Sequence, residues 1–279
     1  MFTGCSIEWM DFALKDVWKG LKKELELKLI MLEINKIYCG DCLELMHEIQ
    51  DKSIDMVLAD PPYGTTACKW DSVIPLAPMW EQIERIIKQN GAIVITSSQP
   101  FTSVLILSNL SLFKYEWIWD KSLPVGHLNA KKRPLKLHEN ICVFYKKQPT
   151  YNPLKTFGHN KKIARAVYKK HADGNSVYGA EERDTFYSST ERYPVSIQRF
   201  NGANQKNKTH PTQKPLSLME YLIMTYTNKG DIVLDFAIGS GTTAVACINL
   251  HRNFIGIEKE QKYVDIANKR ITQAEPQLF

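Results

Sequence analysis

Short apolar segments alternate with amphipathic ones along most of this chain, and this alternation limits the fold more than any other feature. Short apolar runs suit strands, and apolar residues at every third or fourth position suit helices. We predict strands at residues 34–38, 54–59, 92–96, 115–120, 140–145, 231–236 and 253–258, and helices at 42–49, 77–91, 100–110, 216–226, 242–250 and 262–271. Gly91 is expected to end the second helix. The alternation predicts an α/β fold with a parallel sheet covered on both faces.

Two parts of the chain break this pattern. Residues 1–32 have helical periodicity and many charges, so we expect a helical extension to which the sequence assigns no role. Residues 148–208 are polar and rich in Tyr, Asn, Lys and Ser. Because a structureless loop of that length is unusual inside a compact domain, we interpret this stretch as an inserted recognition segment. The remaining parts, 33–147 and 209–279, carry the alternating pattern.

The charge distribution favours a polyanionic partner. The chain has 279 residues, a net charge of +6 and a pI near 8.8, which is a mild excess. Lys and Arg gather in residues 131–170, where Tyr and Phe are interleaved with them, and this combination favours a nucleic-acid-binding face. The residues that we expect to contact nucleic acid are Lys131, Lys132, Arg133, Lys161, Lys162 and Arg165.

Several classes of protein are disfavoured. No apolar run approaches the roughly 20 residues of a membrane helix, and the first residues do not resemble a secretory signal, so we expect no membrane contact. Cys39 and Cys42 form a C-x-x-C pair, but no second pair lies at a zinc-like spacing. We therefore expect a turn at these cysteines, no bound metal, and reduced thiols in a cytoplasmic protein.

The segment V-L-D-F-A-I-G-S-G-T-T-A, residues 233–244, predicts a cofactor site. Gly239 and Gly241 allow a tight turn, and the helix that follows begins with unpaired N–H groups. Asp235 ends the preceding strand, and Glu258 ends the next one, where it is placed to accept both hydroxyls of a ribose. The glycine spacing also fits a dinucleotide fingerprint, so NAD is a rival. Asp235 would repel a pyrophosphate, whereas it tolerates the cationic amino-acid end of S-adenosylmethionine.

The segment Asp60-Pro61-Pro62-Tyr63 follows a buried strand and predicts a second site. The prolines make a rigid turn, but a turn alone requires neither an acid nor a tyrosine. Because prolines lack N–H groups, the rim presents acceptors, namely the Asp60 carboxylate and the Pro61 carbonyl. Acceptors suit an exocyclic NH₂ group, and Tyr63 offers an aromatic face for a planar base.

Together, D-P-P-Y and D-x-x-x-G-S-G-T-T resemble the amino-group DNA methyltransferases. The catalytic motif precedes the polar insert and the glycines come last, an order that resembles the β group of that family. The resemblance runs from Ile34 to Ala274 and implies a circularly permuted, Rossmann-like methyltransferase fold. It makes 33–147 the catalytic half, 148–208 the target-recognition region and 209–279 the cofactor-binding half.

The resemblance implies methyl transfer from S-adenosylmethionine to the N6 amino group of a flipped-out adenine in double-stranded DNA. An acid at the first motif position is commoner for adenine, and cytosine N4 is the alternative target. Members of the β group often form homodimers. The implied catalytic residues are Asp60, Pro61, Pro62 and Tyr63, and the implied cofactor-binding residues are Asp41, Cys42, Lys214, Asp235, Ala237, Gly239, Gly241, Thr242, Thr243 and Glu258.

One departure and three rivals remain. Many relatives have Pro-Phe after the acid of the glycine loop, whereas this chain has Phe236-Ala237. The rival functions are an NAD-dependent oxidoreductase, a DNA-binding protein without catalysis, and a methyltransferase that acts on RNA or on a protein amide.

Overall fold

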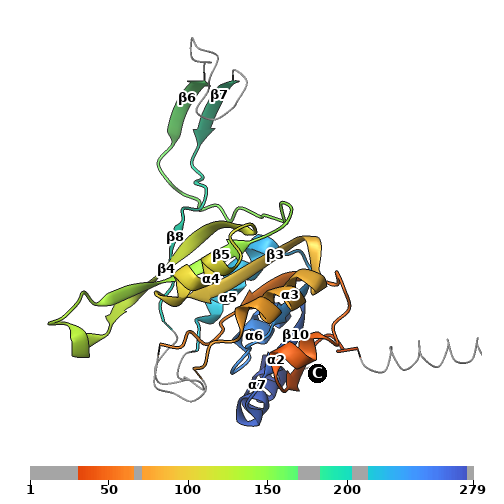
Figure 1. The fold of residues 1–279 in the computed structure, drawn as a ribbon. Helices are drawn as coiled ribbons and strands as arrows, with labels where there is room; N and C mark the ends of the chain where they lie inside the picture. Colours follow the sequence, from red (N-terminus) through yellow and green to blue (C-terminus); the bar gives the residue numbers. More distant parts are fainter. Residues whose placement is uncertain (1–30, 66–70, 169–182, 203–212, 275–279) are drawn as a thin grey trace, which may run out of the picture.

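A mixed sheet forms the centre of the protein (Figure 1). The computed structural model describes residues 31–65, 71–168, 183–202 and 213–274, so the expected N-terminal helix lies outside the described residues. Within these ranges the sheet has eight strands in the order β1-β10-β9-β2-β3-β5-β4-β8. Their bounds are β1 Lys36–Cys39, β2 Ile54–Ala59, β3 Ile87–Ser97, β4 Phe113–Val125, β5 Lys136–Phe144, β8 Ile197–Arg199, β9 Ile232–Asp235 and β10 Asn253–Glu258.

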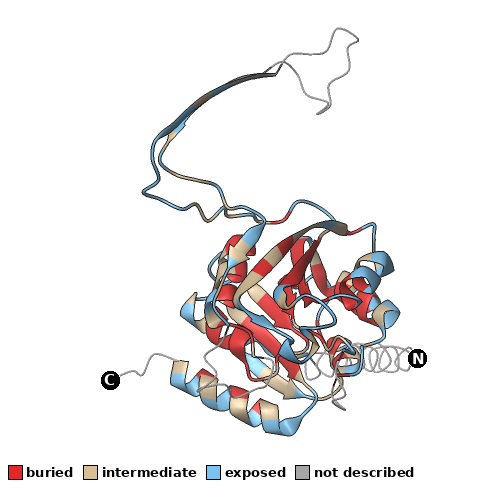
Figure 2. Ribbon diagram, turned by 90° about the vertical axis from the view of Figure 1, so that its left-hand side faces the viewer, coloured by how far each residue is buried: buried red, intermediate tan, exposed pale blue. Residues whose placement is uncertain are grey.

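Helices cover both faces of this sheet, as the sequence predicted. They are α2 Cys42–Met46, α3 Leu76–Ile86, α4 Phe101–Ser108, α5 Leu216–Tyr226, α6 Thr242–Asn249 and α7 Gln261–Ala274. Helices α2, α3 and α4 share one apolar cluster with the sheet, and α5, α6 and α7 share another. Strand β2 shows why its sequence is almost wholly apolar, because Val57 and Ala59 belong to the first cluster and Met56 and Leu58 to the second. The buried residues therefore run through the whole sheet (Figure 2).

The prediction of a parallel sheet is wrong at β5. Strands β1, β10, β9, β2 and β3 are parallel, but β5 pairs antiparallel with both β3 and β4. The reason is the connection between β4 and β5, which is an arm of residues 126–135 with one 3₁₀ turn, His127–Asn129, and no crossover helix. A parallel neighbour needs such a crossover, so β5 runs back beside β4.

The prediction that Gly91 ends a helix is also wrong. Helix α3 ends at Ile86, and Gly91 lies inside β3. The pairing of β3 with β2 steps from Ile54↔Ile87 to Met56↔Ala92, so the extra β3 residues form an irregularity in the ladder. A Cβ on Gly91 would lie 2.9 Å from the Asp55 carbonyl oxygen, so this glycine permits a close approach of two strands. Strand pairing has overridden the helical periodicity of residues 87–90.

The polar segment of the sequence forms a ribbon that projects from the body (Figures 1 and 2). Strands β6, Lys162–Tyr168, and β7, Arg183–Ser189, pair antiparallel in a separate sheet. At the base of the ribbon Thr156 and Arg192 exchange two backbone hydrogen bonds, of 3.0 and 2.9 Å. The chain then returns to the central sheet, where β8 pairs with β4. The arm of residues 126–135 projects separately (Figure 1).

None of the helices that the structure describes is long and apolar enough to cross a membrane.

Helix α5 is attached to the sheet by a buried hydroxyl, and this predicts an asymmetric result for two tyrosines. Tyr226 accepts a hydrogen bond from Trp117 Nε1 at 2.7 Å, and its hydroxyl lies 2.8 Å from that of Tyr115. Replacing Tyr226→Phe leaves the indole N–H without its acceptor, so the free energy of unfolding in urea should fall by about 1–3 kcal/mol.

Tyr221→Phe is the matched control on the same helix. The Tyr221 hydroxyl is buried and has no hydrogen-bond partner among the described residues, so its removal should leave stability unchanged or raise it. Equal losses in the two variants would contradict the assignment.

Candidate active site

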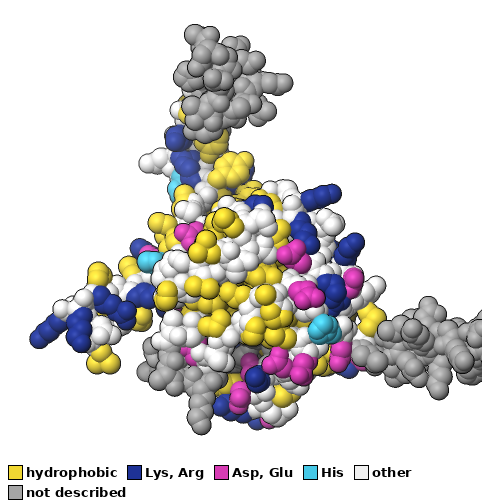
Figure 3. All heavy atoms as spheres, in the orientation of Figure 1, with side chains coloured by type: hydrophobic (Ala, Val, Ile, Leu, Met, Phe, Trp, Pro, Cys, Tyr) yellow, Lys and Arg dark blue, Asp and Glu magenta, His cyan; other side chains and the backbone are white. Residues whose placement is uncertain are grey.

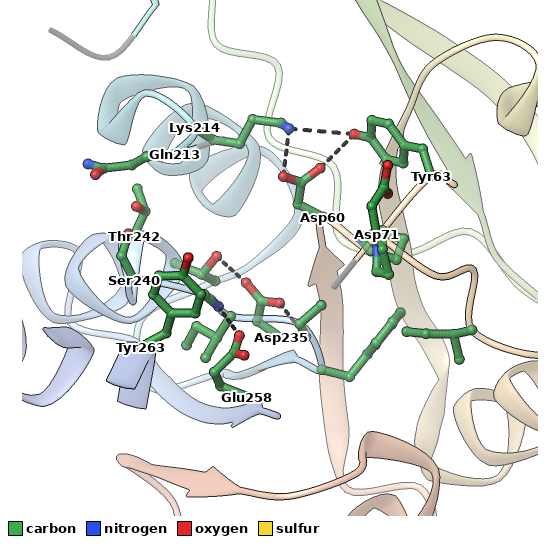
Figure 4. A pocket seen from close by; sticks show the side chains of 18 of the residues that line it. Asp60, Tyr63, Asp71, Gln213, Lys214, Asp235, Ser240, Thr242, Glu258 and Tyr263 are labelled. Carbon is green, nitrogen blue, oxygen red and sulfur yellow. Dashed lines mark hydrogen bonds and ion pairs between the residues drawn. The ribbon is translucent and has the colours of Figure 1, made fainter. Parts of the chain in front are cut away.

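A cavity of about 1220 Å³ lies at the carboxyl ends of the parallel strands (Figure 4). Parallel pairing brings the loops after β1, β2, β9 and β10 to the same edge of the sheet, where ligands bind in open α/β folds. The predicted residues that line the cavity are Asp41, Cys42, Asp60, Pro61, Pro62, Tyr63, Lys214, Asp235, Ala237, Gly239, Thr242, Thr243 and Glu258. Two motifs distant in the sequence therefore share one cavity.

Asp60 is the centre of a dense hydrogen-bond cluster at the end of β2. Its Oδ1 accepts from the Tyr63 hydroxyl at 2.6 Å and from the Thr96 hydroxyl at 2.5 Å. Burial, followed by the neighbouring carboxylates, raises the pKa of Tyr63 well above its usual value, so this phenol remains a donor. The Tyr63 ring stacks on Phe101 with centroids 5.5 Å apart. Together these contacts fix both the carboxylate and the ring.

Lys214 joins this cluster from the segment before α5 (Figure 4). Its Nζ lies 2.6 Å from Asp60 Oδ2, 3.3 Å from Glu139 Oε2 and 3.5 Å from the Tyr63 hydroxyl. Burial alone lowers the pKa of the Lys214 ammonium, but the carboxylates of Asp60 and Glu139 outweigh it, and the net pKa is raised. Lys214 is therefore charged, and its ammonium is directed at Asp60 and Tyr63 rather than at the glycine loop.

Asp235, at the end of β9, lines the side of the cavity formed by the glycine loop. Its Oδ2 accepts from the Thr243 hydroxyl at 2.6 Å and its Oδ1 from the Ala237 amide at 3.1 Å. Burial raises the pKa of Asp235 to about 7, against the lowering effect of these two hydrogen bonds. Next to it, Phe236 is buried and lines the wall of the cavity.

Glu258, at the end of β10, links the glycine loop to the segment before α7. Its Oε2 accepts from the Gly239 amide at 3.0 Å, and its Oε1 accepts from the Glu260 amide at 2.9 Å. Each oxygen keeps a second lone pair for a ligand. The carboxylate is thus held in place while it can still accept hydrogen bonds from the cavity.

Gly241 is the predicted cofactor residue that does not line the cavity. Its φ of +80° is left-handed, and a Cβ would lie 2.8 Å from Ala267 Cβ on α7. The glycine is needed for this turn and for the contact between the loop and α7. Its contribution is to the shape of the loop.

The chain changes direction at Gly40 and Asp41, between Cys39 at the end of β1 and Cys42 at the start of α2, where the sequence predicted a turn. Asp41 caps α2 by accepting from the Leu43 amide at 2.9 Å. Burial raises the pKa of the Cys42 thiol to about 11, which keeps it protonated. Cys39 and Cys42 are free, and within the described ranges no group of three or more His, Cys, Asp or Glu is arranged to hold a metal ion.

Three residues near the rim were not predicted from the sequence, namely Glu139, Lys121 and Thr96. Glu139 on β5 is buried and forms an ion pair with Lys121 on β4, and Thr96 lies on β3. The available signal was Glu139 itself, an acid two residues before the apolar run 141–144 and therefore close to the buried part of a strand. Its partners were not predictable because they depend on the antiparallel course of β5.

The six predicted DNA-binding residues lie outside the cavity. Lys131, Lys132 and Arg133 are exposed on the arm, where Lys and Arg side chains gather beside apolar ones (Figure 3). Lys161, Lys162 and Arg165 are exposed at the start of the β6–β7 ribbon.

Comparison with known proteins identifies the family. A family model described as DNA methylase, for N6 and N4 methyltransferases, matches residues 54–269. The chain belongs to the DNA methylase family. It is 31% identical to the type II methyltransferase M.HinfI of Haemophilus influenzae in an alignment 273 residues long, which covers 87% of this chain and 70% of the relative. It is 29% identical to the type II methyltransferase M1.MboII of Moraxella bovis over 88% of this chain and 99% of the relative.

Solved structures support the same family. The crystal structure of the M1.HpyAVI–SAM complex is 28% identical, with a TM-score of 0.57, and the match covers 84% of this chain and 98% of that one. The PvuII DNA methyltransferase, described as cytosine-N4-specific, is 16% identical with a TM-score of 0.61 over 89% of each chain, and it shows the shared fold. Family membership sets aside the NAD-dependent oxidoreductase.

The raised pKa of Asp235 predicts how the stability of the methylase depends on pH. The folded state keeps the Asp235 proton up to about pH 7, whereas the usual pKa is 3.8. The folded state therefore binds more protons between these values, and stability falls as the pH rises from about 4 to about 7. In urea unfolding without added ligand, the free energy of unfolding should fall by roughly 2–3 kcal/mol between pH 5 and pH 7 because of this group.

Asp235→Asn should remove this part of the pH dependence. Asp231→Asn, at the other end of the same strand segment, should keep it. The assignment is contradicted if the wild type and Asp235→Asn have parallel pH profiles of unfolding free energy.

Proposed function

We propose that this DNA methylase transfers the methyl group of S-adenosylmethionine to the N6 amino group of an adenine in double-stranded DNA. The observation that carries the proposal is that the Asp60–Tyr63 rim and the glycine loop, through Gly239 and Ser240, line one cavity. An acceptor rim and a cofactor loop must face each other for a group to pass directly between them. The type II methyltransferases among the relatives support DNA as the substrate.

The residues of the cavity fit S-adenosylmethionine, which the 28% identical M1.HpyAVI carries in its solved complex. Glu258 keeps free lone pairs that can accept from the ribose hydroxyls. Asp41, which follows the neighbouring strand β1 and also lines the cavity, is placed to contact the adenine end of the cofactor. Asp235 is buried, and no positively charged side chain among the described residues has a main effect on its raised pKa. Its carboxyl group therefore suits the cationic amino-acid end of the cofactor. When bound, this cofactor supplies a reactive methyl group on a positively charged sulfur. Thr242 and Thr243 begin α6 beside it.

The residues of the rim hold and orient the target amine. The Asp60 carboxylate and the Pro61 carbonyl accept the two N–H groups, which draws the nitrogen lone pair out of conjugation and toward the cofactor half. Tyr63 and Thr96 fix Asp60 Oδ1, so the orientation of the carboxylate is set before the substrate binds. Tyr63, backed by Phe101, offers its ring to the base. The target atom lies inside the double helix, so the base must be flipped out.

Cytosine N4 is the alternative target, since cytosine also presents an NH₂ group beside a ring nitrogen. The acid at Asp60 favours adenine through the resemblance described above. The two targets give different methylated nucleosides, so one assay separates them.

Two projecting elements supply the DNA-binding surface in this proposal. The arm carries Lys131, Lys132 and Arg133 together with the exposed Leu128, and the ribbon of residues 148–202 carries Lys161, Lys162 and Arg165. Cations neutralise phosphates and give affinity, whereas base contacts give specificity. We assign target recognition to residues 148–208 and phosphate contacts to the arm.

Replacing Asp60→Ala tests the active site. Removing the carboxylate leaves the amine without its main acceptor, so methyl incorporation should fall by at least about 100-fold. The measurement is transfer of tritium from labelled S-adenosylmethionine to unmethylated genomic DNA, followed by nucleoside analysis. Methyladenosine without methylcytidine is expected in the wild type.

The control for this experiment is Asp51→Ala, which removes an acid at the exposed pair with Arg85. It should keep wild-type activity. Full activity in Asp60→Ala would refute the proposed site, and DNA binding without any methyl incorporation by the wild type would favour the non-catalytic rival.

A triple variant, Lys131→Ala, Lys132→Ala and Arg133→Ala, tests the arm. If each cation contacts one phosphate, the slope of log K against log salt should decrease by about 2–3. Fluorescence anisotropy with duplex DNA at several salt concentrations measures this slope. Lys229→Ala with Lys269→Ala, two exposed cations elsewhere on the surface, should leave the slope unchanged. An unchanged slope in the triple variant would exclude the arm from the DNA interface.

A further inference from the structure

The ammonium of Lys214 lies where the proposed mechanism places the target amine. Lys214 Nζ donates to Asp60 Oδ2 at 2.6 Å and lies 5.6 Å from the centre of the Tyr63 ring (Figure 4). These are the carboxylate and the ring that the substrate base would use. A nitrogen bearing N–H donors therefore already bonds to the acceptor that the proposed mechanism assigns to the substrate.

Two amines would be crowded together at Asp60. Oδ1 already accepts two hydroxyls, from Tyr63 and Thr96, both of which belong to the folded protein. Oδ2 already accepts from Lys214, so a target amine that used the remaining lone pair of this oxygen would lie directly beside the ammonium. A lysine cation that remained there would also lie beside a nitrogen that gains positive charge during methyl transfer, and like charges at that distance oppose the reaction.

Glu139 provides a second place for the same ammonium. Glu139 is 9% exposed, and its Oε1 pairs with Lys121. Its Oε2 lies 3.3 Å from Lys214 Nζ, yet this oxygen is buried and has no aligned hydrogen-bond donor among the described residues. A buried acceptor is stabilised by a well-aligned donor, so Oε2 favours a closer approach of the ammonium that is already paired with it. A small movement of Lys214 Nζ away from Asp60 would provide it.

We propose that Glu139 is a positioning residue that receives the Lys214 ammonium when the target amine takes its place on Asp60. Lys214 then alternates between two carboxylates. Without substrate it neutralises the Asp60 carboxylate and helps to orient it, and with substrate it leaves Oδ2 to the amine. This inference rests on the proposed function, because it requires an amine as the substrate group.

Glu139→Gln is the first test. The amide keeps the size of the side chain but removes the charge that attracts Lys214, so the ammonium stays on Asp60. In assays with unmethylated genomic DNA and labelled S-adenosylmethionine, kcat should fall on the order of tenfold. The Kd for S-adenosylmethionine, measured by calorimetry, should stay within about twofold, because the cofactor half is untouched.

Two further variants separate a role in positioning from a structural one. Glu139→Asp is the poorer fit in size but keeps the charge, and it should retain more activity than Glu139→Gln. Glu116→Gln, on the neighbouring strand β4, removes a half-buried acid that accepts from Asn140 at 2.8 Å, and it should behave as wild type. If Gln were tolerated better than Asp at position 139, shape rather than charge would matter, and the proposal would be wrong.

A double-mutant cycle gives the decisive readout. In a Lys214→Met background there is no ammonium to receive, so adding Glu139→Gln should change kcat by less than about twofold. If the loss caused by Glu139→Gln were the same with and without Lys214, Glu139 would act independently of it and the inference would fail.

The two proposals fail in different ways. Absence of methyl transfer by the wild type would overturn the proposed function. An active wild type whose Glu139→Gln variant matches the Glu116→Gln control would overturn this inference alone.

Discussion

The parallel pairing of β2 with β9 is the constraint on which the site depends. Met56 lies opposite Val233 and Val57 opposite Leu234, so two strands that are far apart in the sequence end side by side in the sheet. Because they are parallel, the Asp60 rim and the Asp235 loop emerge at the same edge. The distance between the two loops is fixed by the spacing of neighbouring strands, about 4.8 Å for each step across a sheet. The order of the motifs along the chain therefore matters little to the chemistry.

Much of the fold and of the site was predictable because local patterns and tertiary structure agree there. Strand β10 and helix α5 have the predicted bounds, and the acids at the carboxyl ends of strands, Asp60, Asp235 and Glu258, all line the cavity. The errors occur where non-local pairing decides. Residues 87–90 continue a helical pattern, but they lie beside β2 and become strand. The reversal of β5 was hidden for the same reason, and with it the approach of Glu139 to Lys214.

The buried charges at the rim are better understood through function than through stability. Glu139 and Lys214 are buried and their partners Asp60 and Lys121 are half-buried, and pairing in a protein interior does little more than offset the cost of removing charges from water. A set of apolar side chains of similar volume would serve the core at least as well. What the charges provide is an acceptor held in a single orientation, with its counter-charge supplied by the protein itself. Three different elements contribute to it, namely the loop after β2, the segment before α5, and the antiparallel pair β4 and β5.

The attachment of the β6–β7 ribbon has a consequence for how such an enzyme can diversify. The chain leaves the central sheet after β5 and rejoins it at β8, and both strands pair with the same neighbour, β4. The base is closed by the two hydrogen bonds between Thr156 and Arg192. The residues beyond that closure whose side chains the structure describes, 157–165 and 186–191, belong to neither apolar cluster of the core, so their side chains can change without disturbing the Asp60–Tyr63 rim. If target recognition belongs to this segment, as proposed above, a new recognition sequence can arise by substitution within it while the residues around Asp60 stay the same.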